Sequence, residues 1–128
     1  MSNLTPKSPQ EVEVLYILPA IRRDLSLNLK ELGLEQKAIA KLLNVSEPAI
    51  SQYMSSKRAS QVQFSEKIQG EIKKVAKKIM HGKNEKGQLP MLEETQHLVR
   101  LSLLERTTCG ICQVQVAGVP VGCTACFK

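Results

Sequence analysis

The expected fold rests mainly on residues Gln36–Ser55, which read QKAIAKLLNVSEPAISQYMS. The apolar residues of this stretch follow a helical period on both sides of the three-residue sequence Asn44-Val45-Ser46. Asparagine tolerates the left-handed backbone that a tight turn requires, and a serine in the position of Ser46 can cap the helix that follows. The stretch therefore predicts two short helices, the second with Pro48 in its first turn and running to about Ser56, joined by a tight turn.

The small residues and the apolar residues in this stretch fall where two crossing helices need them. Ala40 has to be small because the second helix packs across it at close range. Val45 and Ile50 fill the angle between the helices, and Ile39, Leu43 and Tyr53 complete the small core. This register favours a DNA-binding helix-turn-helix, and the alternative is a helical hairpin without a ligand.

The second helix of such a motif lies in the major groove with its N-terminal residues near the base edges. Gln52 can form two hydrogen bonds to an adenine edge. Glu47 could accept from a cytosine amino group, or its charge could simply suit the positive end of the helix dipole. The residues expected to face outward are Glu47, Pro48, Ser51, Gln52 and Ser55.

Phosphate contacts are expected around this helix. Gln36 begins the preceding helix, where its amide and the nearby backbone N–H groups can hold a phosphate. Ser46, Lys57 and Arg58 are further candidates. Arg22 and Arg23 are expected on the solvated side of an earlier helix.

The segment Leu18–Ala59 resembles the lambda-repressor-like helix-turn-helix, of the type also found in xenobiotic-response-element regulators. It is more similar to a group of predicted archaeal transcriptional regulators that combine LPxxR, a core of the form QxxIAxxLxVxxxxISQYxxxKR and a cysteine-bearing C-terminal tail. The resemblance covers about a third of the chain, and the C-terminal half agrees with the group only in layout. It implies a sequence-specific regulator that binds a palindromic DNA operator as a homodimer.

Composition and charge agree with a helical DNA-binding protein. The chain has 128 residues, 42% of them hydrophobic and only 3% aromatic, which favours small aliphatic cores between helices. Its net charge of +6 is confined to residues 34–88, as expected of a nucleic-acid-binding surface. We see neither a secretory signal nor a membrane span, so we expect a cytoplasmic protein.

Further helical stripes surround the central stretch. Ser8 and Pro9 begin a helix that Pro19 should kink or restart. Val62–Met80 has one apolar face, with Phe64, Ile68, Ile72, Val75 and Ile79. The last helix begins at Pro90, with Met91, Leu98, Leu101 and Leu104 expected to face inward.

The predicted fold is all-α, a helix-turn-helix bundle of about five to six helices with a short irregular four-cysteine metal-binding tail. We expect a flexible leader over residues 1–8, the DNA-binding domain over 9–61, a helical dimerisation region over 62–106 and the cysteine tail over 107–128.

All four cysteines lie in this tail, as two CxxC pairs separated by ten residues: Cys109, Cys112, Cys123 and Cys126. Two such pairs supply four thiolates and predict a metal centre. Structural zinc suits the count and the spacing. An iron–sulfur cluster, of either the two-iron or the four-iron type, suits the absence of charge from Cys109 through Phe127 better. The apolar side chains that can exclude water from such a cluster are Val114, Val116, Val119, Val121 and Phe127.

The sequence thus leads to a hypothesis of a transcription regulator that senses iron or redox state. Ordering or release of the tail would shift the helix over residues 90–106 at a dimer interface. The alternatives are a DNA-binding factor or co-activator with a structural zinc site, and a thiol-redox or electron-transfer protein. We expect no enzyme, because the chain lacks a phosphate-binding glycine loop and a plausible pair of catalytic carboxylates.

Overall fold

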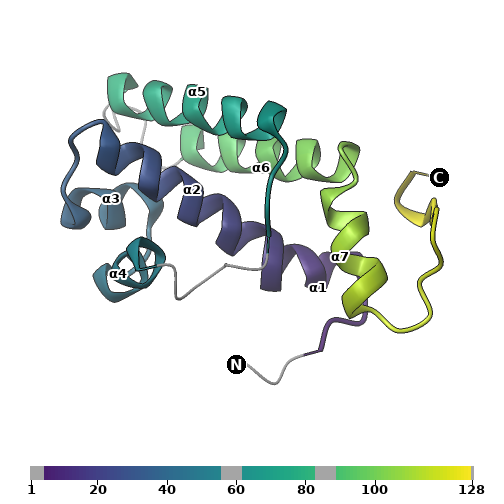
Figure 1. Cartoon of the computed structure of the whole chain (residues 1–128). Helices are drawn as coiled ribbons and strands as arrows, with labels where there is room; N and C mark the ends of the chain where they lie inside the picture. Colours follow the sequence, from purple (N-terminus) through teal and green to yellow (C-terminus); the bar gives the residue numbers. More distant parts are fainter. Residues whose placement is uncertain (1–4, 56–61, 83–88, 128) are drawn as a thin grey trace.

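The computed structural model describes residues 5–55, 62–82 and 89–127, and all regular structure in these ranges is helical (Figure 1). Its spine is a long helical rod that begins with α1 (Pro9–Val12), passes through the π-helical turn η1 (Glu13–Ile17) and continues as α2 (Leu18–Glu31). The all-α class expected from the sequence is confirmed for the described part of the chain.

The start of the rod is capped as expected. The Ser8 hydroxyl accepts a hydrogen bond from the Glu11 amide at 3.4 Å, and Pro9 occupies the first turn. The Lys7 amide donates to Glu11 Oε1 at 2.8 Å, and Pro6 is buried. In the predicted flexible leader, Pro6 is thus buried and Lys7 and Ser8 are hydrogen-bonded, while residues 1–4 lie outside the described residues.

Pro19 was expected to kink or restart the helix, and the structure has a π-helical turn just before it. Proline has no N–H, and its ring crowds the carbonyl of the preceding turn, so a regular α-helix is difficult to continue through it. Just before it, the Leu18 amide donates to the Glu13 carbonyl, one residue farther back than in an α-helix. The wider turn lets α1 and α2 form one rod.

Two short helices follow α2. Gly33, at φ 103°, ends α2, and the chain enters α3 (Gln36–Leu43). Asn44 then adopts φ 56° and ψ 45°, the left-handed conformation predicted for it, and the Val45 amide donates to the Ala40 carbonyl at 3.0 Å. The Ser46 hydroxyl caps α4 (Glu47–Met54) by accepting from the Ala49 amide at 3.2 Å.

The core between α3 and α4 is confirmed residue by residue. The side chains predicted to fill it are buried, except that Val45 is half-buried against the same core. The buried ones are Ile39, Ala40, Leu43, Ile50 and Tyr53. Both helices also pack against α2, which sets their position relative to the rest of the molecule.

The remaining helices cover α2 from the other side. Helix α5 (Glu66–Gly82) packs along α2, and α6 (Leu89–Leu104) lies beside α5 (Figure 1). The apolar stripe predicted for this helix is buried at Ile68, Ile72 and Val75, and Ile79 packs against the core. The predicted start at Val62 is wrong, because α5 begins at Glu66, and Phe64 is buried just before it. The predicted DNA-binding and dimerisation regions thus share one hydrophobic core.

The inward face predicted for α6 was partly wrong. Leu98 is fully buried, but Leu104 is 58% exposed. Val99, which was not expected to face inward, is buried. Leu104 is the last residue of α6, and the chain turns away directly after it, so no neighbouring helix covers its side chain.

The cysteine tail is not irregular throughout, which corrects a second expectation. Arg106 has a left-handed backbone, φ 61°, and separates α6 from a further helix, α7 (Thr107–Gln115). Helix α7 packs against α1 and α6, and Cys112 joins the main core. The chain after α7 is irregular up to the short 3-10 turn η2 (Ala125–Phe127).

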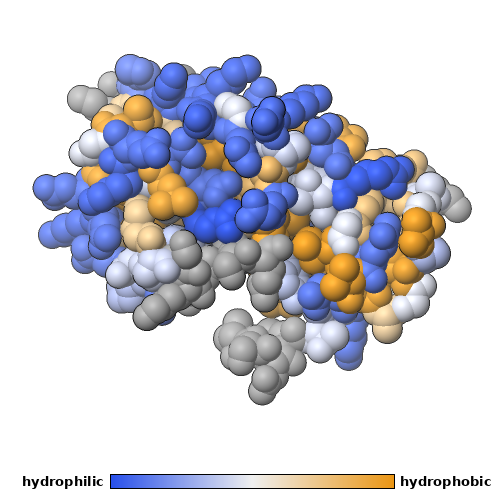
Figure 2. Space-filling view, viewed as in Figure 1, coloured by the Kyte–Doolittle hydropathy of each residue, from blue (hydrophilic) through white to orange (hydrophobic). Residues whose placement is uncertain are grey.

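The two ends of the molecule differ in surface character. Helices α3 and α4 lie at one end of the rod, and α7 with the C-terminal segment lies at the other (Figure 1). In Figure 2 hydrophilic side chains dominate the surface over α3 and α5, while hydrophobic side chains gather at the end that carries α7. None of the described helices combines the length and apolar character needed to cross a membrane.

The left-handed turn at Asn44 provides a test of the fold. We expect Asn44→Val to lower the free energy of unfolding by about 1–2 kcal/mol, because a β-branched side chain clashes with the backbone at positive φ. Asn44→Gly is the matched control and should leave the stability equal or higher, because glycine adopts this conformation without a Cβ clash. Urea unfolding measures both, and a valine variant as stable as the wild type would contradict the turn geometry.

Candidate functional site

Helix α4 presents a polar face to solvent. Its residues Ala49, Ile50 and Tyr53 are buried, which turns the intervening positions outward. The outward residues are those predicted from the sequence, and all five are exposed: Glu47, Pro48, Ser51, Gln52 and Ser55. The predicted phase of this helix is therefore confirmed, whereas its contacts with DNA remain a prediction.

Some of the polar side chains around α4 form hydrogen bonds within the protein. The Ser46 hydroxyl serves as the cap of α4, and the Ser55 hydroxyl donates to the Gln52 carbonyl at 3.2 Å. Glu47 occupies the first turn of α4, where a negative charge suits the helix dipole. Gln36 is half-buried as the first residue of α3. Lys57 and Arg58 lie outside the described residues.

The four cysteines line one cavity of about 310 Å³ at the other end of the rod. Cys109 and Cys112 belong to α7, where a spacing of three residues places both side chains on one face. They are buried, whereas Cys123 is half-buried and Cys126 exposed on the C-terminal segment. The tertiary structure thus brings the two CxxC pairs to the lining of the same cavity.

Residues near the N-terminus also line this cysteine cavity, which the sequence did not predict. Lys7, Ser8 and Pro9 line it, so the beginning of the rod borders the cysteines. The rest of the lining is mainly apolar, with Val116 and Val119 among the side chains. Nothing in the sequence pattern joins the first ten residues to the cysteine tail, and only the packing of α7 against α1 does so.

The prediction that apolar side chains surround the cysteines is half correct. Val116 and Val119 line the cavity, but Val114 and Val121 are 78% and 90% exposed and shield nothing. Phe127 is 40% exposed, and its ring lies beneath the guanidinium of Arg106, with 4.6 Å between Arg106 Cζ and the ring centroid.

Two of the cysteines have a raised pKa, which favours their neutral thiol form. Burial raises the pKa of Cys112, and the charges of Cys126, Cys109, Cys123 and Glu13 raise it further. Burial likewise raises the pKa of Cys126 and of Glu13. Binding of a metal would therefore release protons, because thiolates are the ligating form.

Two residues that sequence reasoning missed complete the site. Arg106 Nη1 donates to the Cys123 carbonyl at 3.1 Å and lies 3.9 Å from Cys109 Sγ. The hydroxyl of Thr108 is buried, lines the cavity and has no hydrogen-bond partner among the described residues. The one sequence feature that could have indicated a role for Arg106 is its position three residues before Cys109.

These features suit a group ligated by sulfur. No three His, Cys, Asp or Glu side chains in the described ranges converge tightly enough to hold an ion as they stand. The cavity of about 310 Å³ is nevertheless at the lower end of the roughly 300–1,000 Å³ of small-ligand sites. Four thiols, an unpaired buried hydroxyl and an apolar lining fit a metal–sulfur group better than an organic ligand.

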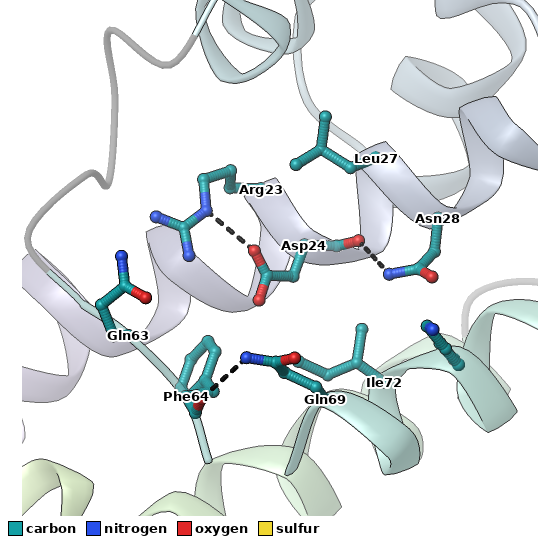
Figure 3. Close-up of a pocket in the computed structure, with 9 residues that line it drawn as sticks. Arg23, Asp24, Leu27, Asn28, Gln63, Phe64, Gln69 and Ile72 are labelled. Carbon is teal, nitrogen blue, oxygen red and sulfur yellow. Dashed lines mark hydrogen bonds and ion pairs between the residues drawn. The ribbon is translucent and has the colours of Figure 1, made fainter. Parts of the chain in front are cut away.

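A second cavity, of about 490 Å³, lies between α2 and α5 (Figure 3). Several of its polar side chains take part in hydrogen bonds and an ion pair within the protein. Arg23 pairs with Asp24 at 2.8 Å and donates to the Val62 carbonyl at 3.0 Å, and Gln69 donates to the Phe64 carbonyl at 2.8 Å. Arg23 is therefore half-buried and structural, which corrects the expectation that it is a solvated surface residue.

Comparisons of the chain with protein-family models, with curated proteins and with solved structures found no match. The function is therefore argued from the two sites themselves.

The unequal burial of the cysteines predicts their order of alkylation in the reduced, metal-free protein. The pKa is raised at both Cys112 and Cys126, so burial decides between them: exposed Cys126 should react with iodoacetamide first and buried Cys112 last. Its rate should still climb at pH values where an ordinary cysteine has levelled off. Peptide mass spectrometry over time gives the order, and urea-unfolded protein, in which the four should react similarly, is the control. Fast reaction of Cys112 would contradict the packing of α7.

Proposed function

We propose that this protein is a sequence-specific DNA-binding transcription regulator of the helix-turn-helix class. The observation that carries the proposal is the left-handed Asn44 turn between α3 and α4, combined with the exposed polar row on α4. The resemblance of Leu18–Ala59 to lambda-repressor-like regulators points the same way. In this proposal α4 enters the major groove and α3 crosses the sugar-phosphate backbone.

The residues of α4 then divide by role. Gln52 is exposed and long enough to read an adenine edge with its amide, and Ser51 lies beside it on the same face. The N-terminus of α3 at Gln36 offers backbone N–H groups to a phosphate. Lys57 and Arg58 follow α4 directly in the sequence and would add phosphate contacts that position the protein on DNA.

We further propose that the four cysteines hold an iron–sulfur cluster. Such a group, when bound, would make the state of the four thiolates depend on iron supply or oxidants. The chain contributes two buried thiols on α7 and two thiols on the segment after it, so joint ligation would tie this segment to α7. The Thr108 hydroxyl could then donate to a sulfur, which would satisfy it.

A physical route connects the cysteine cavity with the DNA-binding helices. Helix α7 contacts α1 and η1, which continue directly into α2. Helix α2 in turn packs against α3 and α4. Ordering or release of the C-terminal segment would thus act on one end of a rod whose other end supports the recognition helix, and the π-helical turn lies at the cavity end of that rod.

A homodimer on a palindromic operator remains part of the proposal. Leu92 and Leu104 of α6 are exposed large apolar side chains, as expected of a helix that a second copy covers. A two-fold dimer would present two recognition helices to successive major grooves on one side of the DNA.

The DNA-reading role of Gln52 can be tested directly. We expect Gln52→Ala to weaken binding to an operator selected from random DNA by about 1–3 kcal/mol and to relax preference at one base position. Gln10→Ala is the matched control, because Gln10 is exposed on α1 at the opposite end of the rod, and it should bind as the wild type does. Binding isotherms at one fixed salt concentration measure both. Unchanged affinity of the Gln52 variant would contradict the proposed orientation of α4.

The sensing role can be tested on protein purified without oxygen. We expect a coloured protein with iron and acid-labile sulfide, and we expect removal of both to change operator affinity by roughly 5–150-fold, the usual range of coupling between two sites. A variant with Cys123 and Cys126 both replaced by serine should bind DNA as the stripped protein does. A colourless protein with zinc and no iron or sulfide would contradict the sensor and favour a structural zinc site.

A further inference from the structure

We propose that Arg106 is the positioning residue that closes the cysteine site, and that its guanidinium holds the second CxxC pair over the first. The inference rests on the proposed four-cysteine site and goes beyond it, because no ligand pattern in the sequence includes this arginine. It holds for a cluster and for zinc alike, since both require the same four thiolates.

The contacts of Arg106 join three parts of the site. Its Nη1 lies 3.9 Å from Cys109 Sγ on α7 and 3.1 Å from the carbonyl of Cys123, seventeen residues along the chain. The Cζ atom of the same guanidinium lies over the ring of Phe127, the residue after Cys126, 4.6 Å from the ring centroid. One planar side chain thus bridges the first pair and both ends of the second pair, which the point charge of a lysine cannot do.

The charge of Arg106 also suits the site. Four thiolates around Zn²⁺ or an iron–sulfur core leave a net negative charge, and half-buried Glu13 adds to the negative potential at Cys112 and Cys126. Residues 107–127 contain no charged side chain, and Arg106 directly precedes this stretch, three residues before Cys109. Lys7 also lines the cavity but is exposed to solvent. An N–H donor beside a ligating sulfur stabilises its thiolate form.

The backbone of Arg106 separates side-chain effects from folding effects. Its φ of 61° is a conformation that glycine adopts more easily than arginine. Arg106→Gly therefore removes the guanidinium while it relieves the backbone, so the metal-free variant should melt at the wild-type temperature or above. A loss of metal affinity in this variant cannot then be attributed to a damaged fold.

The test is an anaerobic titration of the metal-free full chain with Co²⁺, followed by its thiolate-to-metal absorption, and a parallel reconstitution with Fe²⁺ and sulfide. We expect Arg106→Gly to lower Co²⁺ affinity by about 10–100-fold, as loss of an outer-shell partner usually does. Arg106→Lys keeps the charge without the planar fork and should also bind more weakly than the wild type. The matched control is Arg100→Gln, an exposed position on α6, which should bind as the wild type does.

Hydrogen exchange gives a second readout, which separates local release of the C-terminal segment from a general loss of stability. In the Co²⁺-loaded wild type, amides of residues 118–127 should be protected, and in loaded Arg106→Gly this protection should fall while that of α2 stays the same. If Arg106→Gly does not fold, Arg106→Lys carries both measurements.

The outcomes separate this inference from the proposed function. If the wild type binds Co²⁺ or a cluster and the Arg106 variants bind as tightly, with equal protection, the clamp is overturned while the metal site stands. If the wild type takes up neither Co²⁺ nor iron with sulfide, the proposed metal site is overturned and the clamp with it. Weaker binding by both Arg106 variants, with Arg100→Gln unchanged, supports the clamp.

Discussion

Burial of the rod from Pro9 to Glu31 is the interaction on which the rest of the structure depends. Along it Ile17, Ala20, Ile21 and Leu29 are fully buried and Leu25 almost so, and α3, α4, α5 and α6 all pack against α2. Each large aliphatic side chain removed from water in this way contributes about 1.5–3 kcal/mol. Because helices as short as α3 and α4 are marginal in water by themselves, their positions follow from this contact surface.

The rod also gives the molecule its functional layout. One of its ends carries the polar face of α4, and the other borders the cavity of the four cysteines. In the proposed function the two sites communicate because they share this support, with no need for direct contact. Beside the second cavity, Arg23 donates to the Val62 carbonyl and so ties the segment before α5 to the middle of the rod.

Local patterns predicted the elements well wherever one residue has few alternatives. Asn44 marked a left-handed turn, Ser8 and Ser46 marked helix starts, and the apolar stripe of α5 marked its buried face. Prediction failed where a distant segment decides. Helix α7 contains Gly110 and β-branched residues, which are weak helix formers, and it is stabilised by packing on α1 and α6. The exposure of Leu104 and the burial of Arg23 depend in the same way on neighbours that the local pattern does not reveal.

By itself the sequence determined the all-α class, the turn between α3 and α4, the outward face of α4 and the two CxxC pairs, because each follows from local periodicity or spacing. Only the tertiary structure decided that Lys7–Pro9 and the four cysteines line one cavity, and that Arg106 bridges Cys109, Cys123 and Phe127. The physical reason is that these residues meet through the packing of α7 on α1 and a left-handed backbone at Arg106. Both arise from contacts between segments that no local pattern encodes.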